Sequence, residues 1–276
     1  MIDALVNGEP GGVISIHDRG LQFGDGVFET LAIQSGKLLC HEAHFARLEA
    51  GCRHLSIACP DRHLLEHEAL QLCRSHEAAV LKIVVTRGAG GRGYGLPEGV
   101  APNRILTVHE RPVYPAAYYR EGIPSYICAH RLAHQPDLAG IKHLNRLEQV
   151  LLRSEVTATP YPEGVALDPY GNVIEGSMSN LFMIKNGKLV TPDLSRCGIE
   201  GVIRKSIIER NEAAGNETGI REIKPEELYE ADEVFYCNSV IGVWPVRSIG
   251  DKLFNCIDTA LEIMRNLTNN NIIAAV

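Results

Sequence analysis

Lys142 is the residue in this sequence whose type and position best suit covalent chemistry. An apolar segment, residues 138–141, precedes it, and apolar residues with the period of a helix follow it. These residues are Leu144, Leu147, Val150 and Leu151. An amine beside an apolar wall loses its proton more readily than one in water, and Schiff-base chemistry requires a neutral amine. The alternative is a surface lysine at a helix start, with its stem lying over apolar neighbours.

Glu175 and Arg47 are two further candidates. Glu175 stands beside Gly176 at the end of an expected strand, in mostly apolar company. A carboxylate there is costly unless a cation or a hydrogen-bond donor accompanies it, although a water-exposed turn is the alternative. Arg47 lies in an expected helix over 41–50, and its fork of N–H groups suits phosphate oxygens. Its alternative is a solvated helix arginine.

The start of an expected helix over 202–214 is a candidate anion site. The backbone N–H groups of Val202 and Ile203 would point out of its first turn, which favours an anion.

Two other motifs resemble known binding sites but do not match them fully. His41 and His44 are one residue too close for the metalloprotease pattern H-E-x-x-H. The G-x-G-x-x-G at 88–93 follows a strand, but no helix comes after it, so a dinucleotide site is not expected.

Composition narrows the classes of function. The chain has 276 residues and a net charge of −7, which argues against general binding to nucleic acid or to acidic membranes. No stretch is long and apolar enough to span a membrane, and the first residues do not resemble a signal peptide. The eight cysteines form no C-x-x-C pair, so we expect reduced thiols, no metal site and a cytoplasmic protein.

Strand and helix patterns alternate irregularly, which indicates an α+β fold. We expect helices over 41–50, 61–76, 144–157, 202–214, 226–231 and 256–267. We expect strands over 2–6, 27–33, 80–86, 104–108, 124–129, 164–167, 181–184 and 233–237. A segment with two prolines and three tyrosines separates the halves, and we place the domains at 1–112 and 122–276 with a linker at 113–121.

Four segments resemble one known family in order and spacing. They are D-R-G-L-Q-F-G-D-G-V-F-E at 18–29, R-G-A-G-G-R-G-Y at 87–94, G-I-K-H-L-N-R-L-E-Q at 140–149 and E-G-S-M-S-N at 175–180. The chain is similar in them to the pyridoxal-phosphate enzymes of fold type IV. That family comprises the branched-chain and D-amino-acid aminotransferases and the aminodeoxychorismate lyases. The third segment and G-G-R-G-Y resemble the lyases more closely.

The resemblance implies a two-domain enzyme with pyridoxal 5′-phosphate in the cleft. The smaller N-terminal domain would be an α/β sandwich, and the larger C-terminal domain would be rich in strands and carry the lysine. The family is homodimeric, which implies a homodimer here. Lys142 would bind the cofactor covalently and act as the base, and Glu175 would face the pyridine nitrogen. The remaining cofactor contacts would come from Arg47, Ser179, Asn180, Val202, Ile203 and Ser239, with Asn238 as an alternative to Ser239. Substrate contacts would come from Phe28, Arg92 and Tyr94, with Arg87 a weaker candidate.

The reaction implied is conversion of 4-amino-4-deoxychorismate, a small anionic substrate, to 4-aminobenzoate and pyruvate, a step of folate biosynthesis. Two alternatives stay open. One is an aminotransferase of the same fold, of D-amino-acid or branched-chain type, which would use the same lysine. The other is an inactive protein that binds a nucleotide or phosphate through the glycine-rich segment.

Overall fold

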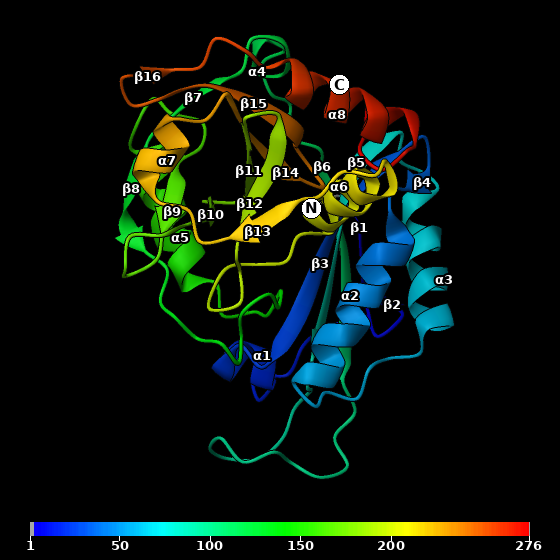
Figure 1. Cartoon of the computed structure of the whole chain (residues 1–276). Coiled ribbons are helices and arrows are strands. Elements are labelled where there is room, and N and C mark those ends of the chain that lie inside the picture. Colours follow the sequence, from blue (N-terminus) through cyan, green and yellow to red (C-terminus); the bar gives the residue numbers. More distant parts are fainter. Residues whose placement is uncertain (1–2, 276) are drawn as a thin grey trace. The chain divides into compact units, whose positions relative to one another are not determined.

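The computed structural model describes residues 3–275, and its contacts divide the chain into two compact units (Figure 1). Among these residues, the first unit comprises 3–112 together with 142–145, and the second comprises 113–141 and 146–275. The segment that carries Lys142 therefore packs with the first unit, whereas the sequence placed it with the second. The expected linker at 113–121 groups with the second unit.

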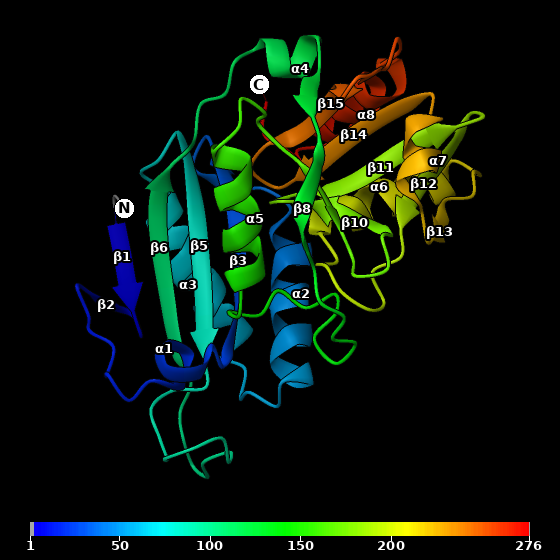
Figure 2. The same cartoon turned by 90° about the vertical axis from the view of Figure 1, so that its left-hand side faces the viewer.

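The first unit is built on a six-stranded antiparallel sheet with strand order β2-β1-β6-β5-β3-β4. The strands are β1 (Asp3–Val6), β2 (Glu9–Pro10), β3 (Gly26–Gln34), β4 (Lys37–Leu38), β5 (Ala78–Thr86) and β6 (Asn103–Glu110). Three helices accompany them: α1 (Arg19–Phe23), α2 (His41–His54) and α3 (Arg62–Cys73). Figure 2 shows β1, β6 and β5 side by side, with α3 behind them.

Side chains alternate between the two faces of this sheet, as the strand period requires. On the face covered by α2 and α3, Leu31 pairs with Leu81, and Leu81 pairs with Val108; all three are fully buried. Phe45 and Leu48 of α2 are also buried, which builds the core of this unit. The opposite face carries half-buried residues, among them Phe28, Thr30, Lys82, Val84 and Thr107.

The second unit contains a seven-stranded sheet and a three-stranded sheet. The larger has the order β13-β12-β11-β14-β15-β16, with β7 paired to β15. Its strands are β7 (Ile123–Ser125), β11 (Asn180–Lys185), β12 (Lys188–Pro192), β13 (Gly219–Arg221), β14 (Glu233–Asn238), β15 (Gly242–Ile249) and β16 (Lys252–Leu253). The smaller has the order β10-β9-β8 and consists of β8 (Ile127–Arg131), β9 (Val165–Leu167) and β10 (Val173–Gly176).

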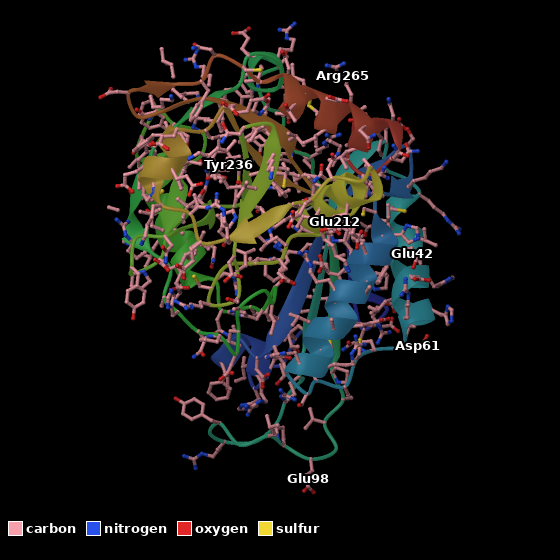
Figure 3. All side chains as sticks on the ribbon, in the orientation of Figure 1. Glu42, Asp61, Glu98, Glu212, Tyr236 and Arg265 are labelled. Atoms are coloured by element: carbon pink, nitrogen blue, oxygen red, sulfur yellow. The ribbon has the colours of Figure 1, made fainter. Side chains whose placement is uncertain are left out.

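Five helices pack on these sheets: α4 (Ala117–Arg120), α5 (Leu147–Thr157), α6 (Val202–Ala213), α7 (Pro225–Tyr229) and α8 (Asp258–Asn269). Phe182, Phe235 and Ile207 lie in the core beneath α6 and α8, while Trp244 lies in a separate core. Tyr236, labelled in Figure 3, belongs to that second core and is fully buried. Within residues 3–275, no helix has both the length and the apolar composition of a membrane span.

The structure corrects several expected elements. The strand expected at 124–129 is two strands, β7 and β8, and the helix expected to begin at 144 begins at Leu147. The helix α1, the strands β12, β13, β15 and β16 and the helix α4 were not expected; most are too short to show a period. The other expected helices and strands are confirmed within a few residues at their ends, except that α2 runs to His54 and Ile2 lies outside the described residues.

The apolar run after Lys142 does not form the inward face that its spacing predicts. Leu147 is 76% exposed, Val150 57% and Leu151 49%, while Leu152 and Val156 are the residues of α5 that enter the core. Residues 142–144 pair with β3 instead of leading into a first helical turn, so α5 begins later and buries a different side. The apolar side of α5 that the spacing predicts to be buried is therefore exposed in the single chain.

All eight cysteines are free thiols, as expected. Five are buried, Cys40 and Cys59 are partly exposed, and Cys256 is exposed.

Candidate functional site

Strand β3 holds the segment that carries Lys142 in an extended conformation. The N–H of Phe28 donates to the carbonyl of Lys142 at 2.9 Å, and the N–H of Leu144 donates to the carbonyl of Gly26 at 2.9 Å. The Nζ of Lys142 lies 4.4 Å from the ring centroid of Phe28, close enough for a cation–π contact. The backbone of Lys142 is thereby tied to a sheet and its amine to a defined ring. Lys82 approaches the same ring, at 5.2 Å.

The next residue of β3, Glu29, points to the other face and contacts α2. Its carboxylate accepts from the Nε of Arg47 at 2.6 Å and from the Nη2 of Arg47 at 2.7 Å. The Nδ1 of His44 lies 2.6 Å from the same carboxylate. Glu29 and His44 are each 1% exposed, and the side chain of Arg47 is 18% exposed. The expected phosphate-binding arginine is thus oriented by a buried ion pair that the sequence reasoning missed.

Burial and neighbouring charges shift the pKa values of Glu29 and His44. Burial alone would raise the pKa of Glu29, but the charges of Arg47 and His44 and their hydrogen bonds lower it to about 2. Burial lowers the pKa of His44 and outweighs the opposing effect of Glu29. The carboxyl group of Glu29 is therefore ionised at neutral pH.

The glycine-rich segment at 87–95 is attached to the first unit through its backbone. Arg19 donates to the carbonyls of Gly93 at 3.0 Å and Tyr94 at 3.3 Å, and its Nε donates to Asp25 at 2.8 Å. Arg87, the weaker substrate candidate, pairs with Asp25 through two nitrogens and is buried, so it has a structural role in the described chain.

Arg92 and Tyr94 are both exposed on this loop, Tyr94 to 86%. The ring of Tyr94 makes an edge contact with Phe23 at 5.4 Å. Figure 3 labels Glu98 farther along the same loop, where it points outward from the first unit. Within the first unit, the two expected substrate residues therefore face outward.

In the second unit, Glu175 is buried and surrounded by donors. It accepts from the N–H of Ile199 at 3.0 Å, and the Nδ2 of Asn180 lies 3.5 Å from it. The amide of Asn180 also donates to the carbonyl of Ile199 at 2.8 Å. Burial lowers the pKa of Arg146, while attraction to Glu175 acts in the opposite direction. The carboxylate of Glu175 therefore has the hydrogen-bond donors that a carboxylate in an apolar segment requires.

A tight turn joins Glu175 to Asn180. The N–H of Gly176 donates to the carbonyl of Ser179 at 2.6 Å, and the hydroxyl of Ser179 donates to the buried carboxylate of Glu163 at 2.8 Å. Ser179, expected among the cofactor contacts, thus binds Glu163. The sequence reasoning missed Glu163, although a glutamate two residues before the apolar strand β9 is a usable signal.

The start of α6 is an anion-binding geometry. Its N-terminal residue, Gly201, has no side chain to cap the helix, and Val202 and Ile203 form the first turn. A side chain at Gly201 would clash with Asn180, whose Oδ1 lies 1.9 Å from the position of the added Cβ. Arg204 adds a buried guanidinium to the same turn and donates to neutral acceptors, at 3.2 Å to Thr191 and 3.0 Å to Pro192.

Ser239 lies in a turn that Asn238 organises. The Oδ1 of Asn238 accepts from the N–H groups of Val240 and Ile241, both at 2.8 Å. Its Nδ2 donates to the carbonyl of Met178 at 2.9 Å. The side chain of Asn238 is thus engaged in holding the turn, which leaves Ser239 as the better candidate for a phosphate contact.

These groups match the chemistry of pyridoxal phosphate. A lysine amine suits its aldehyde, a buried carboxylate suits a protonated pyridine nitrogen, and an uncapped helix start suits its phosphate. None of the groups resembles a metal site, and no cluster of metal-binding side chains occurs within residues 3–275.

Comparison with known proteins identifies relatives along most of the chain. Residues 26–249 match the model of the family described as amino-transferase class IV. An aminodeoxychorismate lyase from Vibrio harveyi is 38% identical over 245 residues, which cover 88% of this chain and 90% of that protein. A branched-chain-amino-acid aminotransferase from Escherichia coli is 27% identical over 249 residues, 86% of this chain and 80% of its own length.

Solved structures give the same order of similarity. The crystal structure of 4-amino-4-deoxychorismate lyase from Pseudomonas aeruginosa matches with a TM-score of 0.93 and 44% identity, over 98% of this chain and 99% of that one. A branched-chain amino acid aminotransferase from Escherichia coli matches with a TM-score of 0.84 and 25% identity, over 97% and 93%. The fold is that of the expected α+β family.

Proposed function

The chain belongs to the amino-transferase class IV family, and on that premise we propose that it is a pyridoxal-phosphate-dependent lyase acting on 4-amino-4-deoxychorismate. The products are 4-aminobenzoate and pyruvate, and the pathway is folate biosynthesis. The observation that carries the proposal is the similarity to two aminodeoxychorismate lyases, which exceeds that to the aminotransferases and extends over nearly the whole chain.

Lys142 has two roles in the proposed reaction. Its amine would hold the cofactor, and the same amine would take the proton from the ring carbon that bears the substrate's amino group. Enolpyruvate then leaves from the adjacent carbon, the ring becomes aromatic, and the enol becomes pyruvate. The cofactor supplies an aldehyde that binds amines and a ring that accepts electrons. The backbone hydrogen bond between Lys142 and β3 and the contact of its Nζ with the ring of Phe28 support this role, because they fix the position of the amine.

Glu175 would keep a proton on the pyridine nitrogen of the cofactor, because a buried carboxylate stabilises a protonated ring nitrogen. The Ile199 N–H and the Asn180 amide keep that carboxylate oriented. Asn180 and Ser179 act through their own hydrogen bonds as parts of the same turn.

Each unit offers groups that would suit the phosphate of the cofactor. In the second unit these are the amides of Val202 and Ile203 at the helix start and the hydroxyl of Ser239, and in the first unit it is the guanidinium of Arg47. Phe28, Arg92 and Tyr94 contact the substrate. Arg92 pairs with a carboxylate of the substrate and supplies the local positive charge that a chain of net charge −7 needs in order to bind an anion.

The decisive experiment supplies the purified protein with aminodeoxychorismate alone. A lyase regenerates its cofactor in each turnover, so we expect 4-aminobenzoate and pyruvate in equal amounts over many turnovers. An aminotransferase passes the amino group to a second substrate. Product that appears only after a 2-oxo acid is added, or that stops after one turnover, would therefore replace the lyase by an aminotransferase of the same fold.

We also propose that the protein is a cytoplasmic homodimer. The exposed row Leu147, Val150 and Leu151 on α5 is the kind of apolar surface that a subunit interface covers. The mass of the native protein should be twice 30.3 kDa by light scattering, and Leu147→Glu combined with Val150→Glu should yield monomers. A monomeric wild-type protein at micromolar concentration would contradict the dimer.

A further inference from the structure

Glu163 is a buried carboxylate that the proposed function does not use. It is 0% exposed, between α5 and β9 in the chain. Its Oε1 accepts from the N–H of Gly164 at 3.0 Å and from both the N–H and the hydroxyl of Ser177, the former at 2.8 Å. Its Oε2 accepts from the hydroxyl of Ser179 at 2.8 Å and from the N–H of Met178 at 3.3 Å. Both oxygens are therefore fully engaged by donors.

Most of these donors belong to the single turn that separates Glu175 from Asn180. Glu163 contacts Ser177, Met178 and Ser179 in succession. The turn also fits closely around the carboxyl group. A Cβ added to Gly176 would lie 2.3 Å from the Ser179 hydroxyl and 3.0 Å from the carboxyl carbon of Glu163. Glu163 thus binds three successive residues of the turn that lies between Glu175 and Asn180.

The same turn reaches the neighbouring turn that carries Ser239. The carbonyl of Met178 accepts from Asn238 at 2.9 Å, and Asn238 in turn receives the N–H groups of Val240 and Ile241. A continuous set of hydrogen bonds therefore runs from Glu163 through residues 177–179 to residues 238–241. One end adjoins the candidate partner of the pyridine nitrogen, and the other adjoins a candidate phosphate contact.

We propose that Glu163 is a positioning residue that holds Glu175 and the Asn238–Ile241 turn in register, and so tunes both the ring and the phosphate contacts of the cofactor. This inference rests on the proposed function, because it takes Glu175 and Ser239 as cofactor contacts. Glu163 itself would touch neither the cofactor nor the substrate. It acts by fixing the backbone between residues that do.

A carboxylate is needed at this position because the groups around it are mostly backbone donors. An N–H group can only donate, so an amide nitrogen placed against Gly164 or Ser177 would leave two donors facing each other. The hydroxyl of Ser179 can rotate and accept instead. Glu163→Gln should therefore place its nitrogen towards Ser179 and Met178, lose the Met178 contact and loosen the link to Asn238.

The test compares Glu163→Gln with Glu233→Gln in the full-length protein. Glu233 is a matched control, since it is a 3%-exposed carboxylate that accepts from the N–H and hydroxyl of Thr259 and from the N–H of Ala260 at the start of α8. Both variants remove one buried carboxylate from the same unit. The dissociation constants of pyridoxal phosphate and of pyridoxal, which lacks the phosphate, are measured by absorbance titration of cofactor-free protein, alongside the Tm.

For Glu163→Gln we expect weaker binding of pyridoxal phosphate by about tenfold, the scale of one buried donor left unsatisfied. Pyridoxal should also bind more weakly, through Glu175, but by a smaller factor, because it lacks the phosphate contact. Glu233→Gln should lower the Tm and leave both dissociation constants within about twofold of wild type, since distant sites act independently. Ser179→Ala removes one donor to Glu163 and should also raise both dissociation constants. It replaces Glu163→Gln in the test if that variant does not fold.

Unchanged constants in Glu163→Gln with a lowered Tm would overturn the proposal, because Glu163 would then stabilise the fold only. A loss confined to one of the two ligands would overturn the coupling of Glu175 to the Asn238–Ile241 turn. A wild-type protein that binds neither ligand would instead overturn the proposed function, and that outcome is seen before any variant is compared.

Discussion

Arg47 and Glu29 form a two-point ion pair across the helix-covered face of the first unit, with Nε and Nη2 of the guanidinium each bonded to one carboxylate oxygen. The pair fixes the plane of the guanidinium, because a bidentate contact restricts rotation. Phe28, the residue before Glu29, contacts Lys142 on the other face of the same strand. Strand β3 therefore orients the candidate lysine with one residue and the candidate phosphate arginine with the next.

Arg47→Ala should weaken cofactor retention more than it lowers turnover per bound cofactor. The loss of a charge-assisted phosphate contact should cost roughly 1.5–3 kcal/mol of binding free energy. The dissociation constant of pyridoxal phosphate measures this, with pyridoxal as the reference ligand. Arg62→Ala is the control, since Arg62 is a helix arginine paired with Glu66 at the surface. If both variants retain the cofactor as well as wild type does, Arg47 is a structural arginine only.

Stability should fall in acid, and Glu29 should account for part of the loss. The folded-state pKa of Glu29 is about 2, below its ordinary value of 4.5, so its charge stabilises the fold above about pH 4.5 and that stabilisation is lost as the pH falls towards 2. His44, whose pKa is lowered by burial, acts in the same direction below its ordinary value of 6.5. Urea unfolding of wild type and Glu29→Gln between pH 7 and pH 3 measures the effect. The difference in unfolding free energy should shrink as the pH falls, and a constant difference would refute the assignment.

Lys142→Ala should fold and bind no cofactor covalently. Borohydride reduction of wild type followed by peptide mass spectrometry should place the adduct on the peptide that contains Lys142. Lys82 provides a matched control, because its amine approaches the same Phe28 ring. Lys82→Ala should keep the adduct and the yellow colour. An adduct on any lysine other than Lys142 would end the proposed assignment.

Arg92→Ala should raise KM, lower kcat/KM and leave the cofactor colour intact. Arg92 is exposed on a loop whose backbone is held by Arg19, so its removal should not disturb the fold. Loss of a carboxylate contact is a loss of substrate binding, which appears in kcat/KM. Glu98→Ala on the same loop is the control and should leave both constants near wild type (Figure 3). An unchanged KM for Arg92→Ala would remove Arg92 from the substrate contacts.

The sequence by itself determined the family and most of the longer elements. Helices α2, α3, α6 and α8 and strands β3, β5 and β14 follow from period and from turn residues, because each is long enough to show which face is apolar. The segments around Lys142, Glu175 and residues 18–29 carried the resemblance to fold type IV enzymes, which the comparison with known proteins confirms. Short elements such as α1, α4 and β16 were missed, since so few residues establish no period.

Only the tertiary structure decided which partners the charged residues have. In the sequence, Glu29 is a single polar residue in an apolar strand. Its pairing with Arg47 and His44 depends on how α2 lies over β3. The role of Glu163 depends on a turn more than ten residues later in the chain. The helix-period run after Lys142 does not form the buried face that its spacing predicts, because backbone hydrogen bonds hold Lys142 and Leu144 against β3. Periodicity records which residues are apolar, whereas hydrogen bonds between distant segments decide which of them become buried.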